Sequence, residues 1–302
     1  MAKSNISIYS ALAANLLIAI TKFVAGSFSN SSAMIAEGVH SLADTINQVL
    51  ILFGIKQSKK PHDAIRPFGY GKELYFWSFI VSIIIFGLGG GVSVYQGYQH
   101  ILKPESTGDP TWNYVVLGIS FLFEGGSLLI AAKEFNKVRH HQTWWQAIKR
   151  SKDPAAFLVL FEDGAALLGL IIVAICVYTG HRFNLPWLDG VASLLVGLLL
   201  VGVSFILARE SRSLLMGEGI APSTQVKIST LVQKDPAVLK PLHILSTYQS
   251  PEEVLLMLIV AFKPHLDTTA IDEAIVRIRE TIKHEFSFVS FILIQPEMYK
   301  NN

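Results

Sequence analysis

Residues 36–54 have the sequence AEGVHSLADTINQVLILFG, which is apolar enough to lie inside a bilayer yet places His40 and Asp44 four residues apart. On a helix, this spacing puts the imidazole and the carboxylate on one face. An ionisable group at membrane depth costs at least about 2.5 kcal/mol, and it persists mainly where it faces a cavity, pairs with a neighbour or holds an ion. The pair therefore indicates a metal site in a protein that moves a charged substrate.

The composition supports a membrane protein with one soluble part. Of the 302 residues, 51% are hydrophobic and 16% are charged, whereas soluble domains have roughly 25% charged residues. The formal net charge of +2 is small, and no basic run alternates with aromatic residues, so nucleic acid is excluded as a partner. The single cysteine, Cys176, excludes an internal disulfide.

Six apolar stretches reach the length of ~20 residues that a membrane-spanning helix requires. An even number of spans puts both termini on the same side of the membrane. The expected spans are residues 6–28, 32–54, 74–98, 112–132, 155–178 and 188–207.

Basic residues are concentrated in the second and fourth connections between these spans. The other three connections carry only Lys103 and Arg182. Because cytoplasmic loops are enriched in Lys and Arg, we expect the two basic loops and both termini to be cytoplasmic. The basic residues are Lys56, Lys59, Lys60, Arg66, Lys72, Lys133, Lys137, Arg139, Lys149, Arg150 and Lys152.

The sequence changes character after Arg209, which predicts a membrane domain over residues 1–208 and a soluble domain over 209–302. The run VLLMLIVAF at 254–262 is too short to span a bilayer and indicates a buried strand. An amphipathic helix follows, with isoleucines spaced four, three and four residues apart from Ile271 to Ile282. With a helix at 223–233 and strands at 242–248 and 286–295, the order is αββαβ. We expect a small α+β, ferredoxin-like fold with its helices on one face of the sheet.

Four polar residues of the second span form one stripe: Glu37, His40, Asp44 and Asn47 fall within roughly 80° of the helix circumference. Asn47 alone would fit interhelical hydrogen bonding. The His40 and Asp44 pair instead offers the nitrogen and oxygen donors that Zn²⁺ prefers, within reach of one ion.

Further acidic residues lie deep in other spans. Glu162 and Asp163 lie about ten residues after the helix start expected at Pro154, which is roughly half a bilayer at 1.5 Å per residue. Adjacent side chains point about 100° apart, so one of the two faces a given ion, and Asp163 is our first choice. Glu124 in the fourth span fits three roles: a ligand, a proton carrier or a partner for Lys22 in the first span.

Several motifs together resemble the cation diffusion facilitator family of divalent-metal transporters over nearly the whole chain. They are Asn15 and Lys22 in the first span, SSAMIAEGVHSLAD at 31–44, RPFGYGKELYFW at 66–77, and Asp189 at the start of the sixth span. The Glu-Asp pair at 162–163 resembles one subgroup of this family.

This resemblance implies a homodimeric antiporter, not an enzyme, which takes Zn²⁺ or a similar ion from the cytoplasm and exports it against protons. It also implies a transport site with two ligands on the second span and a His-x-x-x-Asp pair on the fifth. His40, Asp44 and Asp163 match this pattern, but Val159 stands where the histidine is expected. Glu162, Glu124 or water is left to complete the metal shell.

The chemistry of the donors predicts how exchange would work. Histidine titrates near neutral pH and must lose its proton to bind metal, so protons arriving from the far side can displace the ion. No GxxxxGK[ST] phosphate-binding loop is present, so ATP is not expected to drive transport. The glycines at 87 and 89–91 in the third span allow either close helix approach or bending.

The residues leave open which metal ion is bound and which functional class the protein belongs to. We favour Zn²⁺, while Mn²⁺, Fe²⁺ and Co²⁺ accept the same donors, and an acid-rich shell shifts the preference towards Mn²⁺. The alternatives from other classes are an intramembrane metal-dependent hydrolase, for which no HExxH motif is present, and a passive metal channel. Since no transit peptide is evident, we expect a bacterial inner membrane as the location.

Overall fold

A computed structural model of the chain describes residues 2–104, 111–138, 143–144, 147 and 152–298, with the side chains of 2–11, 13–14 and 155–156 left aside. Three of the basic loop residues, Arg139, Lys149 and Arg150, lie outside this part. The chain divides into a helical unit and a second unit that contains the sheet. The helical unit comprises Met1–Lys56, Phe76–Lys149 and Pro154–Ser211, and the second comprises Gln57–Tyr75, Arg150–Asp153 and Arg212–Asn302.

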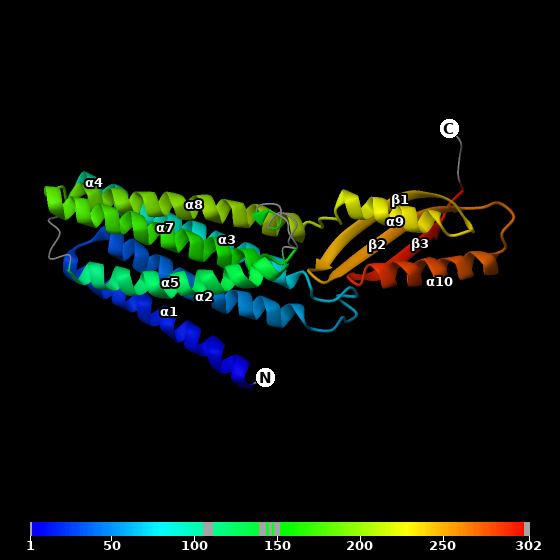
Figure 1. Cartoon of the computed structure of the whole chain (residues 1–302), viewed down its shortest axis with the longest axis horizontal. Helices are drawn as coiled ribbons and strands as arrows, with labels where there is room; N and C mark the ends of the chain where they lie inside the picture. The colour runs from blue at the N-terminus through cyan, green and yellow to red at the C-terminus, as the bar shows by residue number, and fades with distance from the viewer. Residues whose placement is uncertain (1, 105–110, 139–142, 145–146, 148–151, 299–302) are drawn as a thin grey trace. The chain divides into compact units, whose positions relative to one another are not determined.

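Long apolar helices make up the first unit (Figure 1). Within it, α5 packs against both α1 and α7. A core of aliphatic side chains includes Val81, Leu170 and Leu200, from three different helices. The elements are α1 (Ala2–Ser29), α2 (Ser32–Ser58), α3 (Glu73–Ile84), the π-helix η1 (Ile85–Gly91), α4 (Val92–Leu102), α5 (Thr111–Val138), α7 (Pro154–Phe183) and α8 (Trp187–Leu215).

Among the residues that the structure describes, five candidate spans meet the length and hydropathy of a membrane helix, which confirms a multi-pass helical membrane unit. The corresponding part of α1 is the shorter apolar segment Asn15–Ser29, so the number of six spans stays a prediction. The five are Ser32–Ser58, Glu73–Leu102, Thr111–Lys137, Phe157–Phe183 and Trp187–Leu215.

The third span is interrupted by η1, whose seven residues contain the glycines seen in the sequence. A Cβ atom on Gly90 would lie 2.6 Å from Val201 Cγ2, and one on Gly97 would lie 2.5 Å from the backbone nitrogen of Leu194. Real Cβ contacts are longer than this, so η1 and α4 approach α8 closely only because these positions lack side chains. The glycine-rich stretch therefore serves both close packing and a local change of helix type.

The second unit contains a three-stranded sheet in the order β1-β2-β3 (Figure 1). Strand β1 (Val238–Ser250) pairs antiparallel with β2 (Glu253–Phe262), which pairs parallel with β3 (Val289–Pro296). The helices α9 (Pro222–Gln233) and α10 (Thr268–Glu285) add Ile228 and Ile282 to the same core as Leu256 of β2. Both helices thus cover one face of the sheet.

The predicted order of elements, αββαβ, is confirmed in the second unit. The ferredoxin-like assignment and the domain boundary after residue 208 stay predictions. The structure places that boundary inside α8, and it groups loop 57–75 with the C-terminal residues.

Candidate metal site

Helix α2 carries the central pair of the candidate site. His40 is 1% exposed, and its Nδ1 atom lies 3.5 Å from Asp44 Oδ1. Both ring nitrogens of His40 and the Oδ1 atom of Asp44 are buried without a hydrogen-bond partner. Buried polar atoms normally have partners, so three unpaired atoms at one place require an explanation.

The spacing of this pair suits a shared metal ion. Two ligand atoms that each lie about 2 Å from a tetrahedral Zn²⁺ are about 3.3 Å apart. The distance of 3.5 Å between His40 Nδ1 and Asp44 Oδ1 is close to that value. The i, i+4 spacing predicted from the sequence therefore gives a nitrogen and an oxygen that can bind one ion with little rearrangement.

The two acids of α7 point to different neighbours. Asn47 Nδ2 donates a hydrogen bond of 2.6 Å to Glu162 Oε1, and Ser127 Oγ of α5 donates one of 2.7 Å to Asp163 Oδ2. Asp44 lies within electrostatic range of both acids. Helix α7 thus contacts the polar stripe of α2 through Glu162, while Asp163 faces α5.

Glu124 of α5 belongs to a buried ionic network around Lys22. Lys22 is fully buried, and its Nζ atom lies 3.0 Å from Glu37 Oε2, 2.9 Å from Glu124 Oε1 and 2.9 Å from Ser41 Oγ. Of the three roles that the sequence left open for Glu124, the structure shows the partner for Lys22. The other carboxylate oxygens, Glu37 Oε1 and Glu124 Oε2, are buried without a hydrogen-bond partner.

The five predicted site residues do not form one closed metal shell. In the part of the chain that the structure describes, no group of three or more His, Cys, Asp or Glu side chains is arranged to hold an ion. His40 and Asp44 lie together, Glu162 is held by Asn47, Asp163 by Ser127, and Glu124 by Lys22. The assignment of these residues as metal ligands remains a prediction.

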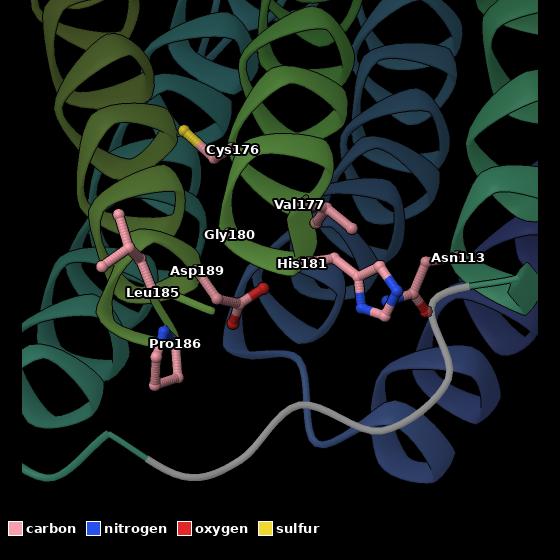
Figure 2. Close-up of a pocket in the computed structure, with 8 residues that line it drawn as sticks. All are labelled: Asn113, Cys176, Val177, Gly180, His181, Leu185, Pro186 and Asp189. Atoms are coloured by element: carbon pink, nitrogen blue, oxygen red, sulfur yellow. The ribbon is translucent and has the colours of Figure 1, made fainter. Parts of the chain in front are cut away.

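Asp189, in the first turn of α8, makes contacts with the start of α2 that were not predicted from the sequence. Its carboxylate accepts hydrogen bonds from Ser31 Oγ at 2.5 Å, Ser32 Oγ at 2.8 Å and the backbone nitrogen of Ala33 at 3.1 Å. Figure 2 shows the same carboxylate beside a small pocket, lined also by His181. These bonds join the first turn of α8 to the first turn of α2. The signal in the sequence for these contacts was an acid at the start of one predicted span and serines at the start of another.

Comparison with known proteins identifies the family. Residues 8–216 match the cation efflux transmembrane domain, and the chain belongs to this family. The match confirms the resemblance seen in the sequence, together with the expectation of a transport protein and not an enzyme.

Three relatives illustrate the range of the similarity. The chain is 36% identical over 219 residues to the "Proton-coupled zinc antiporter SLC30A9, mitochondrial" of Xenopus laevis, which covers 72% of this chain and 39% of the relative. It is 34% identical over 234 residues to "Metal tolerance protein C4" of Arabidopsis thaliana, covering 77% and 51%. It is 25% identical over 203 residues to the "Manganese efflux system protein MneS" of Bacillus subtilis, covering 66% and 64%. The chain thus spans between 39% and 64% of the length of these relatives.

Proposed function

We propose that the chain is a proton-coupled antiporter that exports a divalent transition-metal ion, Zn²⁺ in the first place, from the cytoplasm. The observation that carries this proposal is the buried pair of His40 Nδ1 and Asp44 Oδ1, 3.5 Å apart and without hydrogen-bond partners. Its support is the family assignment and the similarity to a relative named as a proton-coupled zinc antiporter.

Competition between protons and metal for the same lone pairs would couple the two fluxes. An imidazole binds either a proton or a transition-metal ion at a given nitrogen. His40 would take up the ion in its neutral form and release it when a proton arrives from the other side. The carboxylate of Asp44, which lies beside His40, would stabilise the positive charge of the bound proton or metal ion. Rocking of the helices around this midplane site would expose it alternately to the two sides.

Asp163 and one further group are proposed to complete the metal shell. Glu162 fits the remaining position better than Glu124, because a neutral amide on the ligand helix α2 holds Glu162, whereas the buried ammonium of Lys22 holds Glu124. Exchanging one neutral hydrogen bond for a metal ligand is easier than separating a buried ion pair, whose loss is strongly destabilising.

Mn²⁺ is the second candidate substrate. The sequence has Val159 where the family pattern predicts a histidine, so the proposed shell contains three carboxylates and one imidazole. Carboxylate-rich sites favour harder ions such as Mn²⁺ over Zn²⁺.

The arrangement in the membrane is also a proposal. The basic residues of the second and fourth connections support cytoplasmic placement of these loops and of both termini. We further propose a homodimer, in which the sheet-containing unit provides part of the contact between two copies.

Transport into vesicles tests this function. With purified protein in vesicles that are acidic inside, we expect uptake of Zn²⁺ that stops when the pH gradient is removed. His40→Ala, Asp44→Ala and Asp163→Ala are each expected to reduce uptake to background, because each removes a ligand. Glu162→Ala and Glu124→Ala identify the fourth ligand, and parallel assays with Mn²⁺, Fe²⁺ and Co²⁺ rank the substrates.

The matched control is Glu134→Ala, which removes an exposed acid from the same helix as Glu124 and should transport normally. Uptake that ignores the pH gradient would instead indicate a passive channel. Normal transport by His40→Ala would refute the proposed site.

A further inference from the structure

A cleft of about 600 Å³ opens where α1 ends, α2 begins and α4 ends. The first and third connections between the predicted spans lie at this end of the helices. The predicted cytoplasmic loops are the second and fourth connections, so this end is predicted to face the opposite side of the membrane. Several of the side chains that line the cleft are polar: Ser27, Asn30, Ser32, Gln96, Gln99 and His100. The cleft is open to water-soluble ligands, unlike the buried pair on α2.

Two residues of α4 that line this cleft carry unpaired polar atoms beneath its surface. Nδ1 and Nε2 of His100 and Oε1 of Gln96 are buried and have no hydrogen-bond partner. Gln96 and His100 are four residues apart, so both side chains lie on one face of α4. This arrangement repeats the spacing of His40 and Asp44 on α2.

A carboxylate lies next to His100. His100 Nδ1 is 3.9 Å from Asp189 Oδ2, and the Asp189 side chain is 4% exposed. Among the described residues, His100 is the basic side chain that the structure places within 4.0 Å of this carboxylate.

We propose that His100, Gln96 and Asp189 form a second binding site for a divalent transition-metal ion, separate from the pair on α2. An imidazole nitrogen, an amide oxygen and a carboxylate oxygen are suitable donors for such an ion. The distance of 3.9 Å between His100 Nδ1 and Asp189 Oδ2 exceeds the tetrahedral ligand separation of about 3.3 Å, so a small movement of the His100 ring closes the site.

The neighbouring charges predict weak binding. Lys103 lines the same cleft and repels cations. Asp189 already accepts three hydrogen bonds from residues 31–33, which lowers the negative charge available to an ion. Weak binding suits an ion that is leaving the protein. This role as an exit site rests on the proposed transport function, but the binding itself does not.

Equilibrium dialysis of the purified full chain against Zn²⁺ tests the site. His100→Gln is expected to bind one ion fewer per chain than the wild type at saturation, and to lose the nitrogen contribution from the d–d absorption of bound Co²⁺. His181→Gln is the matched control, because His181 lies at the same end and lines the separate pocket of Figure 2 with Asp189. It should bind as many ions as the wild type.

A second variant covers the case in which His100→Gln does not fold. Gln96→Glu replaces a neutral oxygen donor by a charged one at the same place, and it should tighten the weaker binding event about tenfold, which corresponds to about 1.4 kcal/mol. Equal stoichiometry of the wild type and a folded His100→Gln, or an unchanged affinity of Gln96→Glu, would overturn the proposal. Loss of the ion in His181→Gln would place it in the pocket of Figure 2 instead. Transport without this binding event would refute the second site alone, and binding without transport would refute the proposed function alone.

Discussion

Lys22 is the residue on which the buried charges of the helical unit depend most directly. Its ammonium group contacts two carboxylates, Glu37 and Glu124, in a region that is removed from solvent. Removing one partner of a buried ion pair leaves an uncompensated charge, which costs about 3–5 kcal/mol. We therefore expect Lys22→Met to lower the melting temperature of the purified protein strongly.

The same network provides the control for this prediction. When Glu37→Gln and Glu124→Gln accompany Lys22→Met, no charge is left unpaired, and most of the lost stability should return. Size-exclusion profiles of heated samples give both melting temperatures. If Lys22→Met has the same melting temperature as the wild type, Lys22 does not stabilise the two carboxylates.

Individual residues also show how far the site could be predicted from the sequence. Helical periodicity alone places His40 beside Asp44, since both lie on one helix. The bond between Asn47 and Glu162, and that between Ser127 and Asp163, join different helices. Such contacts depend on how the helices pack, which the spacing of residues within one span does not determine.

Among the elements, the loop between α2 and α3 contains a small exposed network. The Tyr70 hydroxyl donates a hydrogen bond of 2.5 Å to Asp63 Oδ2, and backbone amides of Ile65 and Arg66 donate to Oδ1. These bonds favour the charged carboxylate, with Tyr70 as the largest cause, and hold the pKa of Asp63 below its usual value. The same bond raises the pKa of the Tyr70 hydroxyl.

Tyr70→Phe should therefore raise the pKa of Asp63 towards the ordinary aspartate value, as measured by NMR titration of the carboxyl carbon. Because the folded pKa is lowered, the loop is stabilised above the ordinary aspartate pKa and loses this contribution as the pH falls through the lowered value. Tyr98→Phe, on α4, should leave the titration unchanged. An unaltered pKa in Tyr70→Phe would show that the backbone amides alone set it.

Two glycines of the third span allow a direct test of its packing. Gly97→Ala places a Cβ 2.5 Å from the Leu194 backbone nitrogen and 2.7 Å from the Gly190 oxygen, and overpacking of this kind costs about 1–3 kcal/mol. A Cβ on Gly87 meets no atom within 4 Å. Gly87→Ala should therefore leave the melting temperature unchanged or raise it, while Gly97→Ala lowers it. Equal effects of the two substitutions would contradict the close approach of α4 and α8.

At the scale of the whole molecule, we expect two copies to meet on the face of the sheet away from α9 and α10, beside the part of β3 where Phe68 packs on Phe291. Leu245, Met257 and Leu293 are neighbours in the strand register and are 54%, 40% and 51% exposed. This apolar row crosses all three strands on the face away from α9 and α10. Burying it against a second copy would remove apolar area from water.

If the proposed dimer forms through this face, Met257→Glu should convert it into a monomer, because the substitution places a charge at the centre of the row. Light scattering coupled to size-exclusion chromatography measures the mass in detergent. Val276→Glu is the matched control, since Val276 is 43% exposed on α10, outside the row. A wild-type monomer, or a dimer that persists in Met257→Glu, would exclude this face as the contact.

The overall architecture was more predictable than its details. Hydropathy indicated the long helices, and alternation and helical periodicity indicated αββαβ in the C-terminal part, because each pattern reflects burial of one element. Interruption of the third span by η1 and the grouping of loop 57–75 with the C-terminal residues were not predicted. Both depend on contacts between segments far apart in the chain.

The bonds from Asp189 to residues 31–33 have a mechanical consequence for transport. They join the beginning of α2 to the beginning of α8, so we expect these two ends to move together when the protein changes conformation. If His40 and Asp44 move between the two compartments, the end joined to α8 acts as a pivot, and the largest displacement of α2 is expected at its other end, near Ser58. The α2–α3 loop, which follows Ser58, would then move most and would transmit the conformational change of α2 to the residues that it contacts.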